Sequence, residues 1–447
     1  MIRIQTRPAV LGMTLLLVGC GLLDTDTPDI IEPGNLDSPA GAAARMLGAI
    51  RDFGFAKDGD GSQVSTEGLI LLTGDMADEF AHSGFIPSTV EFDQRLVLNN
   101  NGSLSDLYFR LHRARAAAED AAAALQQHSV KPDSTVGIPE VLSLAGFTYI
   151  YFGENFCSGV PYSQAQGDSL VFGPSATTTE TFKRAVERFD SALAHPAAAL
   201  DPDIANLAAV GKGRALLDMD SFPQAAQAVV GVPTEFQYFS EHDPAPLSLS
   251  NAIFVYGTSD EASDGGSISV ADGEGTTGLP YRSASDPRVP FLDTGHLGFD
   301  QTTPQFDVLK YPEPGSPVVT ADGVEARLIE AEAQLQATNL SGMTTTLNDL
   351  RQAFPDLALG NLSQPATQDE GVDLLFAERA FWLYATAHRL GDMRRLVRKY
   401  GRSVNTVFPV GDYLRGGSYG DLVSFPVPVD EETNPQFQRA ACDPRAP

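Results

Sequence analysis

Two short glycine motifs in the chain match the residue types and spacing of enzyme sites. Residues 416–420 read GGSYG, the G-x-S-x-G pattern that presents a nucleophilic serine between a strand and a helix. Pro426 and Pro428 exclude a helix soon after this motif, and no histidine follows His388 to serve as the base. The surroundings therefore do not support a serine hydrolase.

The second motif, GEGTTG at residues 273–278, matches the G-x-G-x-x-G loop of dinucleotide-binding folds. Such a loop must open a helix, whereas Pro280 follows at once in a stretch of turn residues. The seven histidines lack the spacing of paired metal ligands. We therefore predict no catalytic residues, no metal site and no cofactor.

A structural calcium ion is the one inorganic candidate, because carboxylates cluster in one acidic stretch. The carboxylates concerned are Asp260, Glu261, Asp264, Asp272 and Glu274. Their spacing does not match an EF-hand, so a solvated acidic loop is the favoured interpretation.

The N-terminus has the order of charge and hydrophobicity of an export signal. Arg3 and Arg7 precede an apolar run at residues 9–18, which is too short to span a bilayer as a helix. No other stretch of the sequence approaches the length of a membrane-spanning helix.

The apolar run ends in Leu-Val-Gly-Cys at residues 17–20, which resembles a bacterial lipobox. We expect residues 1–19 to be cleaved as a signal peptide and Cys20 to carry the lipid anchor. An ordinary signal with an incidental cysteine is the alternative. Residues 20–37, rich in Asp and Pro, then form an acidic tether.

Composition restricts the classes of partner. The chain has 447 residues and a formal net charge of −28, which repels nucleic acid. A hydrophobic content of 43% is ordinary for a globular protein. Apart from Cys20, only Cys157 and Cys442 remain, and an exported compartment permits a disulfide between them. Two buried free thiols are the alternative.

Helical periodicity dominates the sequence. Helices are predicted over 104–128, 139–156, 178–196, 203–233 (with a short turn inside), 323–338 and 369–400. Thr179 is a plausible N-cap of the third of these. The small residues Ala208, Gly211, Ala215 and Ala225 would allow close helix contact, as in tetratricopeptide-type pairs.

Between residues 234 and 320 the chain changes character, since Pro, Gly, Ser and Asp accumulate there. Short β-like runs also appear, AIFVYG at 252–257 and SISVA at 267–271. We therefore predict a mostly α, tetratricopeptide-like helical-repeat domain over 38–447 with an irregular insertion and short β elements. The helical frame is expected at 38–233 and 321–447, and the loop-rich excursion at 234–320.

The C-terminal third resembles SusD/RagB lipoproteins in four segments that follow one another in the same order. These segments are 324–336, 346–354, 374–398 and 425–437, with shorter landmarks at 152–163, 286–288 and Lys310-Tyr311. The matching residues are Arg327, Leu328, Glu330, Ala331, Glu332 and Ala333 in the first segment, and Glu378, Arg379, His388, Arg389, Asp392, Arg394 and Arg395 in the third. The stretch FWLYATAHR departs from the more charged pattern of the family.

The third segment itself has the character of a structural helix. Residues 381–384 are apolar and contiguous, so we expect them, Trp382 included, to be buried on a helix. The charged residues Glu378, Arg379, Arg394 and Arg395 are expected to form a helix-end network of salt bridges and caps rather than a site.

The resemblance implies a surface-exposed outer-membrane lipoprotein that binds oligomeric nutrients and delivers them to a TonB-dependent, SusC-like β-barrel transporter. Oligosaccharides are the commonest ligands in that family and peptides serve in some branches. The mechanism implied is binding and gating without bond breaking. A lipid-anchored helical-repeat scaffold for envelope protein–protein interactions is the alternative, and a lipid-anchored hydrolase is disfavoured by the failed motifs.

Sugar platforms prefer exposed aromatic rings, and the only tryptophan, Trp382, is expected to be buried. Any platform should therefore use Tyr or Phe from the two non-helical stretches at 74–87 and 254–281. The candidate ligand-binding residues are Asp75, Asp78, Phe80, Phe85, Tyr256 and Tyr281. The alternative is that these rings cover the helical core beneath them.

Overall fold

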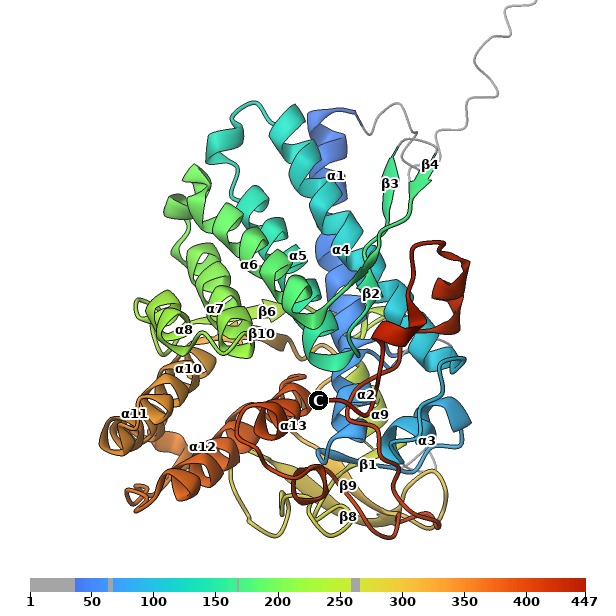
Figure 1. Cartoon of the computed structure of the whole chain (residues 1–447), viewed down its shortest axis with the longest axis vertical. Coiled ribbons are helices and arrows are strands. Elements are labelled where there is room, and N and C mark those ends of the chain that lie inside the picture. Colours follow the sequence, from blue (N-terminus) through green and yellow to red (C-terminus); the bar gives the residue numbers. More distant parts are fainter. Residues whose placement is uncertain (1–36, 63–66, 167–168, 259–265) are drawn as a thin grey trace, which may run out of the picture.

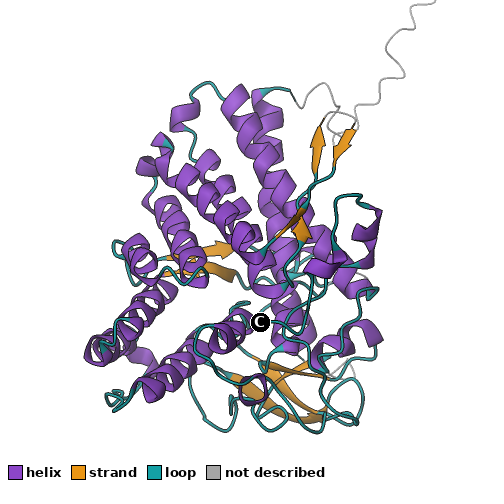
Figure 2. Ribbon diagram, viewed as in Figure 1, coloured by secondary structure: helices purple, strands orange, loops and turns teal. Residues whose placement is uncertain are grey.

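The computed structural model describes residues 37–62, 67–166, 169–258 and 266–447. These residues form fourteen α-helices, which dominate the ribbon in Figure 2. The helices are α1 (Pro39–Asp58), α2 (Leu69–Met76), α3 (Pro87–Asp93), α4 (Gly102–His128), α5 (Gly137–Asn155), α6 (Thr178–Ala194), α7 (Pro202–Asp218), α8 (Phe222–Val229), α9 (Ala252–Gly257), α10 (Gly323–Gln336), α11 (Leu340–Ala353), α12 (Gln368–Trp382), α13 (Arg389–Arg398) and α14 (Val404–Val407).

The strands in the same residues are short and pair only in twos, always antiparallel. They are β1 (Phe80–His82), β2 (Val160–Pro161), β3 (Gln164–Gln166), β4 (Ser169–Val171), β5 (Ser175–Ala176), β6 (Gln237–Ser240), β7 (Ile268–Val270), β8 (Phe291–Leu297), β9 (Pro304–Val308) and β10 (Val318–Asp322). The pairs are β1 with β7, β2 with β5, β3 with β4, β6 with β10 and β8 with β9.

The helices pack in an order that follows the chain. Contacts run from α1 to α4, from α4 to α5, and on through α6, α7 and α8 to α10, α11 and α12. Figure 1 shows this array as a curved stack that passes from blue through green to orange. The predicted mostly α, helical-repeat architecture with short β elements is therefore confirmed. In a stack of this kind each helix pair buries its apolar face against its neighbours.

Small residues allow the close contacts between α5, α6 and α7. The predicted positions Ala208, Gly211, Ala215 and Ala225 are all buried. A Cβ atom added to Gly211 would lie 2.3 Å from ring atoms of Phe189, so a larger residue has no room there. The interpretation of these residues as helix-contact positions is correct.

The N-cap of helix α6 lies two residues before the predicted one. Thr177, not Thr179, caps the helix, because its hydroxyl accepts the N–H of Glu180 at 3.2 Å. The Glu180 carboxylate in turn accepts the Thr177 N–H at 2.7 Å, which completes a capping box. Thr179 cannot form a capping box, because the residue three positions later, Phe182, has no carboxylate.

One β-like run within the loop-rich region is helical. Residues 252–257 form α9, because the Asn251 side chain accepts the N–H groups of Ile253 and Phe254 and so starts a turn of helix. The second run does form a strand, β7, and pairs with β1 far earlier in the chain. The excursion is thus joined to the helical frame by backbone pairing.

The predicted helix at 369–400 is two helices. Helix α12 ends at Trp382 and α13 begins at Arg389, and between them Ala385 and Ala387 adopt φ values of 54° and 61°. The Ala385 N–H donates to the buried Glu79 carboxylate at 2.7 Å. A tertiary contact therefore breaks a sequence whose local pattern favours continuous helix.

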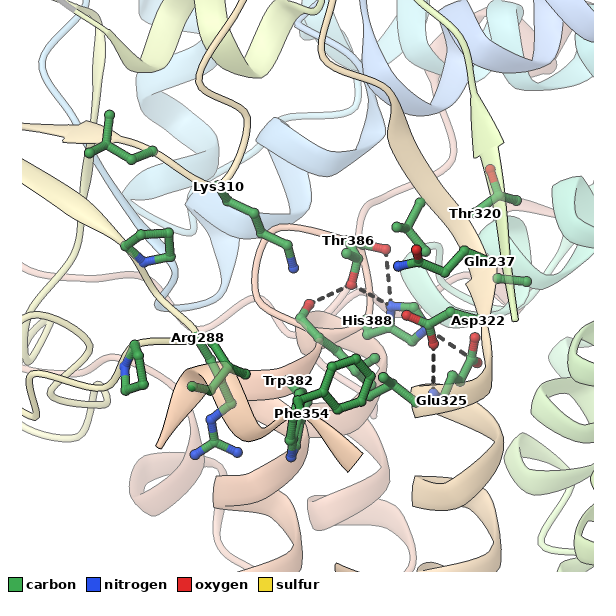
Figure 3. Close-up of a pocket in the computed structure, with 18 residues that line it drawn as sticks. Gln237, Arg288, Lys310, Thr320, Asp322, Glu325, Phe354, Trp382, Thr386 and His388 are labelled. Carbon is green, nitrogen blue, oxygen red and sulfur yellow. Dashed lines mark hydrogen bonds and ion pairs between the residues drawn. The ribbon is translucent and has the colours of Figure 1, made fainter. Parts of the chain in front are cut away.

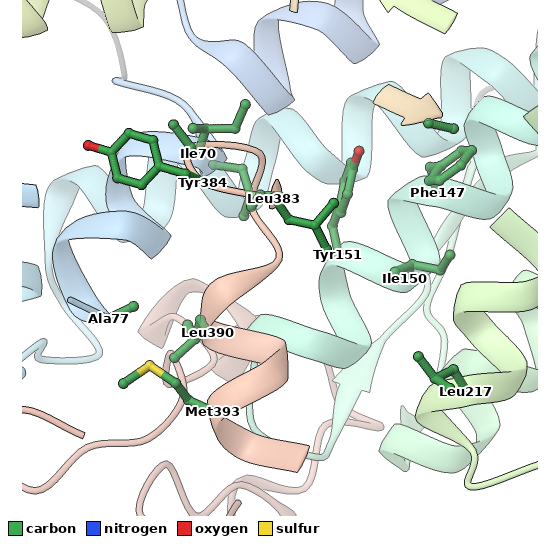
Figure 4. Close-up of a cluster of buried hydrophobic side chains, with 14 of the residues drawn as sticks. Ile70, Ala77, Phe147, Ile150, Tyr151, Leu217, Leu383, Tyr384, Leu390 and Met393 are labelled. Carbon is green, nitrogen blue, oxygen red and sulfur yellow. The ribbon is translucent and has the colours of Figure 1, made fainter. Parts of the chain in front are cut away.

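The largest core cluster combines side chains from early, middle and late parts of the described chain. Figure 4 shows Tyr384 of the α12–α13 break beside Ile70 of α2, and Leu383 of the same break beside Tyr151 of α5. Cys157 after α5 is joined to Cys442 by a disulfide with a Cα–Cα distance of 5.1 Å. The cysteine pair considered in the sequence is thus bonded.

The predicted signal peptide, Cys20 and the tether up to residue 36 lie outside the described residues. Within the described ranges, no helix has both the length and the hydrophobicity needed to cross a membrane.

Candidate ligand-binding surface

Two exposed phenylalanines stand together on the loop-rich part of the fold. Phe85 is 60% exposed and Phe299 is 44% exposed, and their ring centroids lie 5.0 Å apart in an edge-to-face arrangement. Ile86 beside Phe85 and Leu297 at the end of β8 are also exposed. An exposed aromatic pair of this kind offers apolar faces on which a sugar ring can stack.

Backbone pairing holds the two rings in place. Phe85 follows β1, and Phe299 lies in the turn between β8 and β9, which Figure 1 shows at the same end of the molecule as β1. The Ser83 hydroxyl donates to the Gly266 carbonyl at 2.9 Å and accepts the Phe299 N–H at 3.1 Å. One serine therefore joins both segments to the chain beside β7.

A charged pair borders the aromatic rings. Arg415 donates to the Gly84 carbonyl at 2.6 Å, and its Nε lies 3.5 Å from an Asp300 carboxylate oxygen. Burial by itself would raise the pKa of Asp300, but the N–H groups of Thr303 and Thr302 outweigh it and lower that pKa. Asp300 therefore stays ionised, and the surface combines apolar rings with a guanidinium that can donate hydrogen bonds.

A buried polar cluster supports the segment that leads to Phe85. The His82 Nε2 donates to the Thr89 hydroxyl at 3.0 Å, because that hydroxyl itself donates to the Ile86 carbonyl. His82 Nδ1 lies 3.3 Å from an Asp75 carboxylate oxygen. Burial raises the pKa of Asp75, and burial together with neighbouring carboxyls raises that of Asp93 well above its ordinary value. These carboxyls act as structural groups beneath the surface.

Most of the residues predicted to bind ligand are part of the interior. Asp75, Asp78, Phe80 and Tyr281 are buried, so only Phe85 of the predicted rings stands free on the surface. Tyr256 is half-buried and its hydroxyl donates to the Ser62 carbonyl at 3.3 Å. The alternative in which these rings cover the core fits all of them except Phe85.

Asp78 is a structural carboxylate for a clear electrostatic reason. It accepts two hydrogen bonds from Arg389, at 2.6 and 2.8 Å, and one from the Leu279 N–H at 3.0 Å. The Tyr281 ring packs between Phe381 and Tyr384, with centroids 5.4 and 5.1 Å away. These contacts join three distant parts of the chain and leave no face for a ligand.

The arginines of the third motif segment are structural, as predicted, but they lie in the interior rather than at exposed helix ends. Arg379 binds Asp392 at 2.7 and 2.9 Å, and Arg395 binds Glu332 at 2.8 and 3.0 Å. Arg394 donates to backbone carbonyls at the C-terminal end of α5, and burial lowers its pKa to about 10. These contacts tie α12 and α13 to α5 and α10.

The acidic loop offers no calcium site within the described residues, where no cluster of three possible ligands occurs. Asp260, Glu261 and Asp264 lie outside those residues. Asp272 accepts the N–H groups of Arg282 and Ser283, and Glu274 accepts the Tyr419 hydroxyl, so both have protein partners.

Phe299 and Arg415 lie outside the two non-helical stretches, 74–87 and 254–281, from which the candidate residues come. Both are close to Phe85 only through the fold. Trp382, which the sequence predicts to be buried, is only half-buried. Its ring packs against Phe354, with centroids 5.2 Å apart, and lines a cavity. The early end of α12 places the indole there.

The fold and surface define a helical-repeat protein whose loop-rich region presents an exposed aromatic pair. Solved structures with the same fold belong to the SusD superfamily. One from Bacteroides thetaiotaomicron is 14% identical with a TM-score of 0.67, over 90% of this chain and 99% of that chain. Another, from Bacteroides vulgatus, is 16% identical with a TM-score of 0.63, over 90% and 98%. The chain therefore has the SusD-like fold that its C-terminal motifs predict.

A laminarin-binding SusD-like protein is also similar, with 14% identity and a TM-score of 0.61 over 90% of this chain and 98% of that chain. A further neighbour, from Bacteroides fragilis, is a SusD-like carbohydrate-binding protein with a TM-score of 0.65. No protein-family model matches the chain, and no curated protein matches it either.

Proposed function

We propose that this chain is a lipid-anchored, outer-membrane protein that binds oligosaccharides on the surface around Phe85 and Phe299. The exposed edge-to-face pair is the observation that carries the proposal, since two adjoining rings offer a larger apolar face for stacking than an isolated surface side chain does. The SusD-like fold supports it, because neighbours with this fold include carbohydrate-binding and laminarin-binding proteins. Peptides are the second ligand class under the same proposal.

The rest of the proposal concerns anchoring and delivery. Cys20 carries the lipid, the acidic tether gives the domain reach, and the bound oligosaccharide passes to a SusC-like TonB-dependent barrel. The lipobox-like residues 17–20 and the fold support this arrangement. The function requires no bond breaking, which agrees with the failed nucleophile and dinucleotide motifs. Capture of the tagged protein from solubilised outer membranes should bring down a barrel protein, and its absence would favour the scaffold alternative.

The Phe85→Ala and Phe299→Ala variants test the binding surface. Each should weaken binding of laminarin-derived oligosaccharides about five- to a hundredfold, if a sugar ring stacked on one phenylalanine contributes as much as a stacked nucleobase, on the order of 1–3 kcal/mol. Titration calorimetry would measure the affinities, with other neutral oligosaccharides as a panel. Phe109→Ala is the matched control, since Phe109 is 62% exposed on the helical array.

Equal loss in Phe109→Ala, or no loss in either surface variant, would contradict the assignment of the surface. If the unaltered chain bound no oligosaccharide of the panel, the scaffold alternative would gain.

A further inference from the structure

A separate cavity of about 300 Å³ lies where β6, β10, the start of α10 and the α12–α13 break meet (Figure 3). Neither Phe85 nor Phe299 lines it, so it is distinct from the aromatic surface. Ligand pockets in proteins begin at about this size. The cavity therefore suits one monomer rather than an oligomer.

One wall of the cavity is aromatic. Trp382 and Phe354 pack with centroids 5.2 Å apart and both line the space. The Arg288 guanidinium lies over the indole at 5.1 Å, but it is already held by Asp286 and Glu378. This wall offers apolar contact, and the charge of Arg288 is neutralised before any ligand enters.

Four chargeable groups line the remaining walls: Lys310, Asp322, Glu325 and His388. Lys310 donates to the Tyr384 carbonyl, and no described carboxylate forms an ion pair with it. Asp322 caps α10 by accepting the Glu325 N–H at 2.7 Å. Glu325 is 1% exposed, yet neither of its carboxylate oxygens accepts a hydrogen bond from any described residue.

His388 explains why Glu325 lacks a donor. The imidazole Nδ1 lies 3.0 Å from the Thr386 carbonyl, so it must carry the proton and donate there. Its Nε2 lies 2.7 Å from an Arg214 N–H group and therefore accepts. That nitrogen has no proton for Glu325, although it lies 3.2 Å from the carboxylate.

Arg214 forms an ion-pair contact with Glu325 but donates no hydrogen bond to it. Its guanidinium binds the Glu154 carboxylate through two contacts of 2.6 Å, whereas its Nε stands 3.8 Å from Glu325. The cavity is thus lined by two carboxyl groups, those of Asp322 and Glu325, and by one amine, that of Lys310. Burial raises the pKa of Glu325 to about 7 despite the attraction of Arg214 and Arg379, and it raises that of Asp322 to about 6 despite the attraction of Lys310.

We propose that this cavity binds a small ligand through a primary ammonium group, with Asp322 and Glu325 as its acidic partners and Trp382 and Phe354 as its apolar wall. An ammonium supplies the hydrogen-bond donors that the Glu325 carboxylate lacks, and its positive charge favours the ionised form of both carboxyls. An amino sugar and the amino end of a peptide both carry this group. The site does not depend on the aromatic surface proposed for oligosaccharides.

The full chain contains an internal probe for the test, because Trp382 is its only tryptophan. Ligand entry should change the intrinsic fluorescence. Glucosamine is compared with glucose, and leucinamide with N-acetyl-leucinamide, so that each pair differs at the amine. We expect a saturable response to at least one amine and none to its neutral counterpart, and the responding amine identifies the source.

The Asp322→Asn variant keeps an oxygen for the cap of α10 but removes the charge, and should weaken the response at least tenfold. Glu325→Gln should also weaken the response to the amine. Agreement between the two variants would show that the loss does not come from a folding defect in one of them. Phe85→Ala should leave the response unchanged, so that this proposal and the oligosaccharide proposal fail independently. Equal responses to amine and neutral counterpart, no response to any probe, or full affinity in both acidic variants would overturn the proposal.

Discussion

At the scale of single residues, many charged side chains of this protein form buried ion pairs. Asp78 and Arg389 are both nearly inaccessible and are joined by two hydrogen bonds of 2.6 and 2.8 Å. The pair connects the segment before β1 to the start of α13. A buried charge that loses its partner strongly destabilises the folded state, so the fold requires both residues of the pair.

The Arg389→Met variant should therefore lose about 3–5 kcal/mol of the free energy of unfolding, since it leaves Asp78 buried and unpaired. Urea denaturation followed by circular dichroism measures the loss. Arg445→Ala breaks an exposed pair with Asp421 and should change the same quantity by less than about 1 kcal/mol. Similar losses in the two variants would show that burial does not control the strength of these pairs.

At the scale of elements, glycine positions decide how closely the helices approach. Gly211 of α7 faces the Phe189 ring of α6, whereas Gly48 of α1 has no atom within 4 Å of the place where a Cβ would stand. Both glycines lie inside helices, so the same substitution has opposite consequences at the two sites.

Gly211→Ala should lower the free energy of unfolding by about 1–3 kcal/mol, because the new methyl group overpacks the α6–α7 contact. Gly48→Ala, the matched control, should raise it by about 0.5–1 kcal/mol through helix propensity alone. Thermal and urea unfolding of the two variants measure both effects. A gain in stability at Gly211 would mean that Phe189 can move aside without cost.

At the scale of the whole molecule, buried carboxyls set the dependence of stability on pH. Burial raises the pKa of Glu79 to about 8 and that of Glu67 to about 7. In the unfolded chain both groups titrate near their ordinary values, about 4.3. The folded chain therefore binds more protons than the unfolded chain in the interval between.

Since the folded state holds the extra protons, the free energy of unfolding should fall as pH rises from about 5 to about 8. Glu79 alone contributes a slope of about 1.4 kcal/mol per pH unit between its unfolded-state and folded-state pKa values. Urea denaturation across this interval measures the slope, and Glu79→Gln should flatten it. A stability that is constant or rises over the same interval would contradict the protonation of these carboxyls.

Features that depend on neighbours along the chain are predictable from the sequence, whereas features that depend on contacts between distant segments are not. Helical repeats, the small residues at helix contacts and the four C-terminal motif segments are local patterns, and the structure confirms the fold that they predict. The run at 252–257 was misassigned because its apolar residues suit strand and helix equally, and the Asn251 side chain settles the choice. The predicted helix over 369–400 failed because Glu79 binds its middle.

The candidate site shows the same division. Phe85 was predicted from a non-helical stretch, but its partner Phe299 becomes its neighbour only when β1 and the β8–β9 turn are brought together. Asp78 was predicted as a ligand because the sequence cannot show that Arg389, 311 residues away, neutralises it. The sequence alone determined the helical architecture and the export signature, which depend on neighbours along the chain. Only the tertiary structure decided which aromatic and acidic side chains reach the solvent, because burial is a property of contacts between distant segments.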